Sequence, residues 1–510
     1  MLLCAAPVNK RRPRSWAHCT SWLNTDRGFA NESTRRMLSY FGGVSAGMYN
    51  DTHKTQATGT ISYVRTGSTN PNRNPNFLFM QYQVPWENKC FSTTGVTVSG
   101  TTATVQMPTG NMANGRPYPT TSSAGLVVGK VVGCYGSPVA NLNGEKTITA
   151  VNSTSQTFSF TVPSGTSSDS SGSTTFLLKE DANYLRFQEI GLRNWWVRRV
   201  GTTGRVRNNS RWSSSTGDIN LTTWAPTNPR GERYSQFLAR FGNEQWYSVI
   251  PGITGAWQDN VLNPIRSDLY TSETTSDYQR TGTAQAHSNT TVVNEHMKGL
   301  AAFATAVRTI RSSLLCFGNL DNDGSHPELT GKYDGVFYEH ALRTSGDKVN
   351  RPTRIAGYKA NLRGPKIIVY HYDGVDDQAT TIGDSTTLYR RGMALNLIEC
   401  DGYYATDYKF NRIHDEQVAP LGYPIEPDQT AARTGTIWYR RFSNGIAIAN
   451  ESSSASATLS LTGTLAGYRK LGPQDRPSAL GAQTDASFNN GAALSTITLA
   501  AKTGAILVRA

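Results

Sequence analysis

Two acidic residues stand where buried strands of this chain would end. Asp259 closes the run WYSVIPGITGAWQDN, and Glu339 closes the run YDGVFYEHA. Because parallel strands of a barrel end on one face, their last side chains converge on one site. Hydrolysis of an acetal needs two carboxyl groups, one to protonate the leaving oxygen and one to attack the sugar or activate water. The two acids therefore predict cleavage of a glycosidic bond.

Polar residues also end the expected strand between these two and the two expected strands after them. A single acid at such a place is often only a helix cap, but five consecutive strands ending this way indicate a site. Aromatic rings suit the apolar faces of sugar rings, and amide or imidazole groups suit hydroxyls. The residues predicted to bind substrate are Trp257, Asn260, Asn319, Asp321, Tyr338, His371, Asp401, Tyr403 and Asp407.

Structural roles remain open for several of these side chains. His371 could equally be a core histidine with satisfied hydrogen bonds. Asp401, Asp407 and Asp415 could instead form turns or pair with Lys409 or Arg412.

The sequence gives little support to other chemistries. It contains no GxSxG, HExxH or GxxxxGK[ST] motif, so serine hydrolysis and phosphoryl transfer are not favoured. The six cysteines show no CxxC spacing, and His414-Asp415-Glu416 lacks a second histidine at helical spacing. We therefore expect neither a metal nor a cofactor, and we interpret Cys316 and Cys400 as reduced core thiols.

The elements that would position the two acids alternate between strands and helices. Helical patterns cover 181–193, 232–242 and 295–313, and several of the strand runs are apolar almost throughout, as in buried parallel sheets. This alternation predicts a (β/α)₈ TIM-type barrel. The eight expected strands are 38–48, 77–85, 194–200, 246–260, 314–322, 333–341, 366–374 and 393–404.

Two segments depart from this alternation. Residues 92–179 are rich in Thr, Ser, Gly and Val in short alternating runs, which predicts an inserted small all-β module. Its stretch 164–173 is expected to be a flexible loop. Because the insert follows the second strand, it would lie on the face of the active site and extend a substrate groove.

Residues 434–510 alternate again and predict a C-terminal antiparallel β-sandwich. The expected domains are an N-terminal arm with the first part of the barrel (1–91), the inserted β module (92–179), the remainder of the catalytic barrel (180–433) and the β-sandwich (434–510).

Two resemblances follow from these segments. The runs GTTATV, NGEKTITAV and TFSFTVPS resemble small β domains inserted into bacteriophage structural proteins. Residues 190–510 resemble a little-characterised group of barrel-fold glycoside hydrolases. The matching motifs are Asp259-Asn260, Asp334 to Glu339, Asp401 to Asp407, Asp415-Glu416 with Leu421 to Pro424, and Arg440 to Asn450.

The layout of acids is also similar to that of the α-galactosidase clan. This resemblance implies that Asp259 is the nucleophile or base and that Glu339 is the general acid. The clan uses aspartate on the sixth strand where this chain has Glu339, which leaves the mechanism open.

The charge balance indicates the class of partner. With a net charge of +13 in 510 residues, the chain would be attracted to an anionic polymer. The basic residues form no stripe with interleaved aromatics, which disfavours nucleic acid and favours an anionic cell-surface glycan. No apolar run is long enough for a membrane span, and no signal peptide is recognised.

We therefore expect a glycoside hydrolase that depolymerises a polysaccharide, carried on a virion or acting outside the cell after release. The alternative is a non-catalytic, glycan-binding tail or decoration protein of a virion.

Overall fold

The computed structural model describes most of the chain after residue 90 and two short segments before it. The described residues are 47–51, 54–55, 91–92, 95–110, 120–172, 174–180, 184–201, 217–244, 255–261, 276–320, 324–338, 341, 351–364, 366–372, 386–400, 403–406, 413–428, 434–476 and 482–510.

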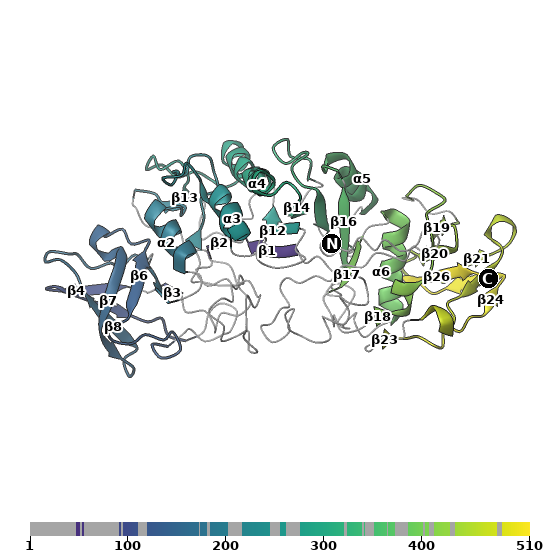
Figure 1. Cartoon of the computed structure of the whole chain (residues 1–510), viewed down its shortest axis with the longest axis horizontal. Coiled ribbons are helices and arrows are strands. Elements are labelled where there is room, and N and C mark those ends of the chain that lie inside the picture. The colour runs from purple at the N-terminus through teal and green to yellow at the C-terminus, as the bar shows by residue number, and fades with distance from the viewer. Residues whose placement is uncertain are drawn as a thin grey trace.

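A six-stranded parallel sheet forms the centre of the molecule (Figure 1). Its order is β1 (Gly47–Asp51), β12 (Gly255–Val261), β14 (Leu315–Leu320), β15 (Gly335–Tyr338), β16 (Ile367–Tyr372) and β17 (Tyr403–Thr406). Every neighbouring pair is parallel. The protein is thus a mixed α/β protein with several sheets. A closed barrel of eight strands is not formed by the residues that the structure describes.

Helices join and cover these strands. They are α2 (Tyr184–Arg193), α3 (Tyr234–Gly242), α4 (Thr290–Ile310), α5 (Arg351–Asn361) and α6 (Thr386–Glu399). Helices α4, α5 and α6 each lie in the chain between two successive strands of the sheet, as parallel pairing requires. Helix α4 begins after Asn289, whose side chain accepts hydrogen bonds from Thr291 N and Val292 N. The three helices expected from the sequence are confirmed.

One expected strand is a helix. Residues 393–399 belong to α6, and the strand in this region is β17, which begins only at Tyr403. Helix α6 contacts β17 on one side and strands β20 (Gly445–Asn450) and β26 (Thr503–Arg509) on the other. Because both sides are covered, residues 393–398 (MALNLI) are all buried, and this mostly apolar run resembles a buried strand.

A second expected strand does not join the sheet. Within 194–200, Asn194 has a φ of 51° at the end of α2. The short strand β10 (Arg198–Arg199) then pairs antiparallel with β13 (Ser276–Asp277). Of the first two expected strands, 77–85 lies outside the described residues. The other, 38–48, is described only from Gly47, where β1 begins.

The segment from 91 to 178 forms a seven-stranded antiparallel sheet at one end of the molecule (Figure 1). Its order is β3 (Phe91–Ser92), β9 (Thr175–Leu178), β6 (Val131–Tyr135), β7 (Gly144–Asn152), β8 (Thr157–Thr161), β5 (Thr102–Gln106) and β4 (Val96–Ser99). Phe91 pairs with Phe176, so the chain enters and leaves this sheet on neighbouring strands. The side chains of this segment form their own apolar core, which includes Val105, Phe158 and Phe160.

The stretch expected to be a flexible loop in this segment is held by hydrogen bonds. Asp169 is buried and pairs through its backbone with Val96. Its carboxylate accepts a hydrogen bond of 2.9 Å from Ser137 and another from Thr174. Burial acts to raise the pKa of Asp169, but these hydrogen bonds and those from Ser171 lower it overall.

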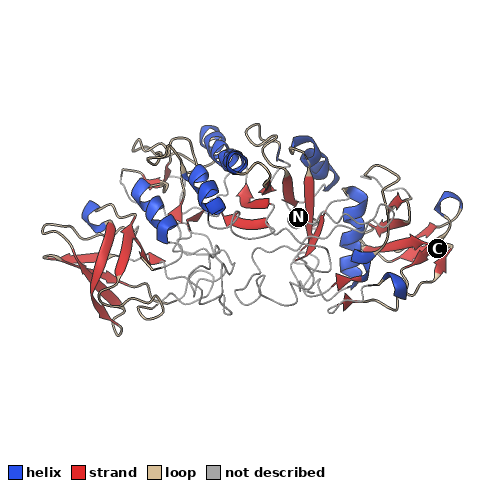
Figure 2. Cartoon of the chain, viewed as in Figure 1, coloured by secondary structure: helices blue, strands red, loops and turns tan. Residues whose placement is uncertain are grey.

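Two antiparallel sheets share a core at the other end of the molecule. The five-stranded sheet has the order β19 (Ile437–Phe442), β20, β26, β22 (Tyr468–Lys470) and β24 (Ala493–Leu494), and the second sheet pairs β21 (Ala457–Ser460) with β25 (Thr496–Leu499). Figure 2 shows helix α6 standing between these strands and the parallel sheet.

The remaining elements are short. Strand β2 (Lys54–Thr55) pairs with β11 (Gly217–Asp218), and β18 (Ile413–His414) pairs with β23 (Ala482–Gln483). The 3₁₀ helices are η2 (Ala140–Leu142), η9 (Asp415–Val418), η10 (Gly463–Leu465) and η11 (Pro473–Asp475). No helix in the described part of the chain is both long and apolar enough to cross a membrane.

Candidate active site

Strand β12 carries Asp259 near its carboxyl end, beside strand β1. The backbone register pairs Asp259 with Asp51, and Trp257 with Tyr49. On the other side of β12, Trp257 pairs with Phe317 and Gln258 with Gly318 of β14. Asp259 therefore lies in the interior of the sheet at the end where the strands finish.

The backbone of β12 is irregular at this point. Gln258 pairs with Gly318, but the next pair is Val261 with Leu320, so β12 has one residue more than β14 between them. The extra residue belongs to the dipeptide Asp259-Asn260. Bulges of this kind redirect a side chain and are common next to active sites.

The residue before Asp259 faces the helices. Gln258 is fully buried, and its side-chain oxygen accepts a hydrogen bond of 2.5 Å from the Tyr333 hydroxyl. The same hydroxyl lies 3.2 Å from the backbone oxygen of Leu300 in α4. These contacts place the side chain of Gln258 on the side of the sheet that α4 covers.

The residues before Glu339 and His371 face the same side. Tyr338, the last residue of β15, and Tyr370 in β16 are register partners, and both are fully buried. The ring of Tyr338 lies 5.5 Å from that of Tyr358 in α5 and 6.1 Å from that of Tyr370, centroid to centroid. The stacking on sugar expected of Tyr338 finds no support in this position, because its ring packs against a helix.

A buried ion pair lies behind Tyr370. Burial is the main cause that raises the pKa of Glu399 at the end of α6, while Arg351 and a hydrogen bond from Tyr370 act against it. Arg351 donates hydrogen bonds of 3.0 and 2.9 Å to Glu399 Oε1, one of 3.2 Å to Glu399 Oε2 and one of 2.6 Å to Glu451. Burial likewise raises the pKa of Tyr370, and the charge of Glu399 adds to this. The pair fixes β16 against the helix layer.

Asp334, the first residue of the motif that ends in Glu339, has a structural role. It is fully buried, and its carboxylate accepts hydrogen bonds from Cys316 N at 2.8 Å and from Arg363 at 2.7 Å. It thereby ties the start of β15 to β14 and to the end of α5.

Other residues of the resembling motifs also hold the framework together. Arg440 is buried and donates to the backbone oxygen of Leu397 in α6 at 2.9 Å. The Asn450 amide donates to the backbone oxygens of Ala455, Leu499 and Ala500. These motifs therefore join the C-terminal sheets to helix α6 and to each other.

The structure brings together only part of the expected site. Asn319, His371 and Tyr403 lie on β14, β16 and β17, and Trp257, Asp259 and Asn260 lie on β12. Asn319 is buried, with 8% of its surface exposed. The expected residues that lie outside the described part of the chain are Asp321, Glu339, Asp401 and Asp407.

Sequence reasoning missed Asp51. We placed the first strand at 38–48, whereas β1 runs from Gly47 to Asp51. The run Tyr49-Asn50-Asp51 has the same order of aromatic, polar and acidic residues as Trp257-Gln258-Asp259 in β12. That shared ending was the signal that could have identified Asp51.

The segment His414-Asp415-Glu416 is part of a buried polar network. Asp415 accepts hydrogen bonds from Asp485 N at 3.0 Å and from the Asn489 amide at 2.9 Å. Glu416 accepts one of 2.7 Å from Arg390. Among the described residues, no group of three or more His, Cys, Asp or Glu is arranged to hold a metal.

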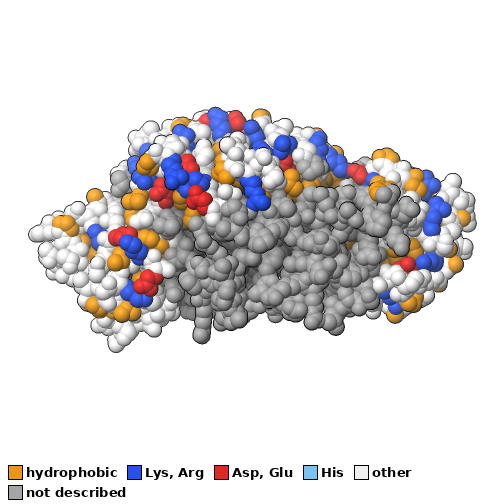
Figure 3. Space-filling view, viewed as in Figure 1, with side chains coloured by type: hydrophobic (Ala, Val, Ile, Leu, Met, Phe, Trp, Pro, Cys, Tyr) orange, Lys and Arg blue, Asp and Glu red, His pale blue; other side chains and the backbone are white. Residues whose placement is uncertain are grey.

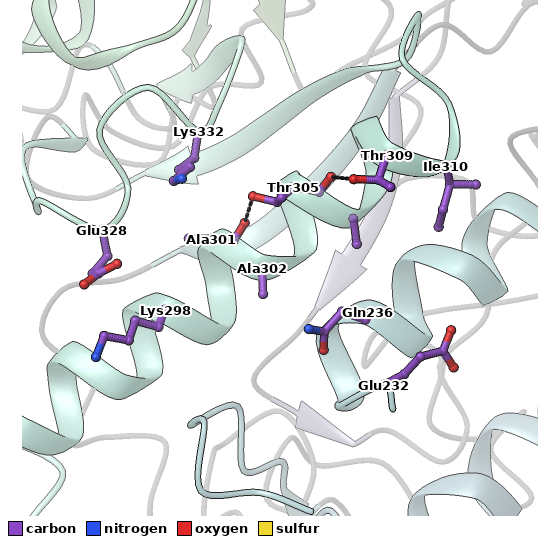
Figure 4. A pocket seen from close by; sticks show the side chains of 11 residues that line it. Glu232, Gln236, Lys298, Ala301, Ala302, Thr305, Thr309, Ile310, Glu328 and Lys332 are labelled. Carbon is purple, nitrogen blue, oxygen red and sulfur yellow. Dashed lines mark hydrogen bonds between the residues drawn. The ribbon is translucent and has the colours of Figure 1, made fainter. Parts of the chain in front are cut away.

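A groove of about 460 Å³ lies on the outer side of the helices (Figure 4). Small side chains of α4, among them Ala302 and Thr305, form its floor, and Glu232, Lys298 and Lys332 lie at its edges. The last turns of α4 lead into β14 and so lie where the strands begin. No predicted site residue lines this groove.

Charged side chains are mixed over the helix layer. Figure 3 shows lysine and arginine side chains interspersed with acidic ones on the face in view, without a single basic stripe among the described residues.

Comparison with known proteins yields distant likenesses only. No family model matches the chain, and a search of curated proteins found no match. Among solved structures, the chain is similar to the type III pullulan hydrolase from Thermococcus kodakarensis, with 11% identity and a TM-score of 0.33 over 63% of this chain and 57% of that one. It is also similar to the GH36 α-galactosidase AgaA from Geobacillus stearothermophilus, with 11% identity and a TM-score of 0.28 over 62% and 42%.

A third likeness is to the endosialidase of phage phi92. It has 24% identity and a TM-score of 0.13, and covers 18% of this chain but only 12% of the endosialidase. With such low TM-scores, these likenesses carry no argument for an activity.

Proposed function

We propose that the chain is a glycoside hydrolase that cleaves a polysaccharide at the carboxyl ends of the parallel strands. Asp259 acts as nucleophile or base and Glu339 as general acid. One observation carries the proposal: the residues just before Asp259, Glu339 and His371 are Gln258, Tyr338 and Tyr370, and all three face the helices.

The alternation of strands extends this observation to the candidates. Side chains of successive strand residues point to opposite faces. We therefore assign the face opposite the helices to Glu339 and His371. We assign it to Asp259 as well, because β12 stays in regular register with β1 as far as Asp259 and the shift against β14 is completed only at Val261. The register gives the same face to Asn319 and Tyr403, because Gly318 pairs with Val336 and Val369 pairs with Tyr403.

The roles of the two carboxyl groups follow from the chemistry of acetal hydrolysis. In the first step Asp259 attacks the anomeric carbon, or removes a proton from the attacking water, while Glu339 gives its proton to the departing oxygen. Glu339 must hold a proton at the working pH, which burial or a neighbouring carboxylate can arrange. Asn319, His371 and Tyr403 would bind sugar hydroxyls or rings, and so would the remaining candidates Trp257, Asn260, Asp321, Asp401 and Asp407. We leave Tyr338 out of the binding site.

The substrate class follows from charge and from the antiparallel sheet of residues 91–178. The net charge of +13 favours an anionic cell-surface glycan. We propose that this sheet extends the substrate-binding region at the carboxyl ends of the parallel strands, so that a long polymer can bind. We also propose that the protein acts from a virion or outside the cell. Replacing 92–179 with a short linker should weaken binding to polymer and spare turnover of a short substrate. Equal loss on both substrates would contradict this role.

The test is release of reducing sugar from a panel of bacterial capsule, lipopolysaccharide and exopolysaccharide preparations. On the substrate that wild type cleaves, Asp259→Asn and Glu339→Gln should each lower kcat/KM by at least about 100-fold, since each removes a group that acts in the transition state. Glu180→Gln is the matched control, because this side chain lies in the turn after β9 and is 66% exposed. If the Asp259→Asn/Glu339→Gln variant retains wild-type rates, the assignment is wrong.

A second function, glycan binding without cleavage, is favoured by the basic charge alone. It predicts that wild type binds a glycan of the panel without releasing sugar. The double variant would then bind with unchanged affinity.

A further inference from the structure

Asp51 lies beside Asp259 on the neighbouring strand. The two residues are register partners in the parallel pair of β1 and β12. Neighbouring strands are about 4.8 Å apart. Register partners in a parallel pair belong to the same face of the sheet, so the two aspartates occupy adjacent positions on one face.

In the described part of the chain, few other charged residues lie on the strands next to Asp51 and Asp259. On the far side of β12, the strand β14 ends in Asn319 and Leu320, which carry no charge. After Asp51, the next described residue with a charge is Lys54, whose register partner is Asp218 on β11. The proposed function also assigns Glu339 and His371 to this face, but they belong to the strands beyond β14 in the sheet. Among the described register partners of β12 only Asp51 carries a charge, so Asp51 and Asp259 are neighbouring like charges.

We propose that Asp51 is a positioning residue that forms a coupled carboxyl pair with Asp259. Carboxylates at adjacent strand positions disfavour each other's ionisation, so one of them keeps its proton to a higher pH. Asp51 thereby sets the pH range in which Asp259 is ionised. Its effect on turnover rests on the proposed function, whereas the pairing itself does not.

The pairing can be measured without any substrate. Protein labelled with ¹³C at the aspartate carboxyl carbon is titrated by NMR as wild type, Asp51→Asn and Asp259→Asn. In wild type, one aspartate should titrate about one pH unit or more above the ordinary range. This elevated titration should be absent from both variants and retained in Glu180→Gln. Its absence from wild type, or its persistence in either variant, overturns the pairing.

The effect on turnover is tested by the pH profile of kcat/KM on a cleaved glycan. Removing the like charge in Asp51→Asn should move the acid limb down by about one pH unit. Asp51→Glu should restore the wild-type limb, which a merely structural role would not do. An unshifted limb in Asp51→Asn, with Asp259→Asn inactive, rejects the role of Asp51 and leaves the proposed function intact. If Asp259→Asn is as active as wild type, the proposed function fails, and the titration still decides the pairing.

Discussion

The guanidinium of Arg390 donates a hydrogen bond of 2.7 Å to Glu416, and both side chains are buried, with 4% and 2% of their surface exposed. Arg390 belongs to α6 and Glu416 to η9. A second hydrogen bond from Arg390, of 2.5 Å, reaches Asp485, which lies between β23 and β24. One arginine thus joins the last helix of the parallel sheet to the C-terminal strands.

Removing this arginine should destabilise the fold strongly. Arg390→Met leaves the buried carboxylate of Glu416 without its cation, which costs about 3–5 kcal/mol in similar pairs. The loss is measured as the free energy of unfolding in denaturant. Arg193→Gln removes a partly exposed pair with Glu189 and should cost less than about 1 kcal/mol. Equal losses in the two variants would contradict the importance of the buried pair.

The same network predicts an acid sensitivity. Partial burial acts to raise the pKa of Asp485, but hydrogen bonds from Ser487 and Arg390 hold this pKa at about 2. Because the folded pKa is depressed, Asp485 stabilises the fold above the unfolded value of 3.8, and this contribution is lost as the pH falls toward 2. The unfolding free energy of wild type should therefore fall more steeply than that of Asp485→Asn between pH 4 and pH 2. Parallel curves for the two proteins would argue against it.

The strands that the sequence predicted correctly are buried on both faces of the sheet, and this burial requires apolar residues at nearly every position. In β15 all four residues are buried, and the apolar run YDGVFYEHA indicated this directly. Helix α6 was misassigned for a related reason, because eleven of its residues are buried and the run MALNLI (393–398) within it is almost entirely apolar. Burial alone does not distinguish a strand from a helix that is covered on both sides.

Part of the site was predictable and part was not. The position of Asp259 on the parallel sheet follows from the apolar run before it. Its pairing with Asp51 does not, because the two residues are far apart in the sequence and only the strand order brings β1 next to β12. Long-range pairing of this kind is invisible to local patterns.

Thiol reactivity provides a test of the core. Burial raises the pKa of Cys134 and of Cys316, and both are free thiols. Native protein should therefore show little alkylation at either residue and faster alkylation at Cys400, which is only partly buried. Peptide mapping after brief iodoacetamide treatment measures the three rates. Urea should make the rates similar, and equal rates in native protein would contradict the burial of Cys134 and Cys316.

A glycine in α4 gives the sharpest test of how this helix packs. In an exposed helix, replacing glycine with alanine stabilises by about 1 kcal/mol. At Gly299, however, the added Cβ would lie 1.8 Å from the backbone oxygen of Leu221, which cannot move without shifting its whole segment. Gly299→Ala should therefore lower the free energy of unfolding by about 1–3 kcal/mol despite the better helix propensity. At Gly364 an added Cβ meets nothing within 4 Å, so Gly364→Ala is the control and should leave stability nearly unchanged. A stabilised Gly299→Ala protein would show that α4 does not approach Leu221 this closely.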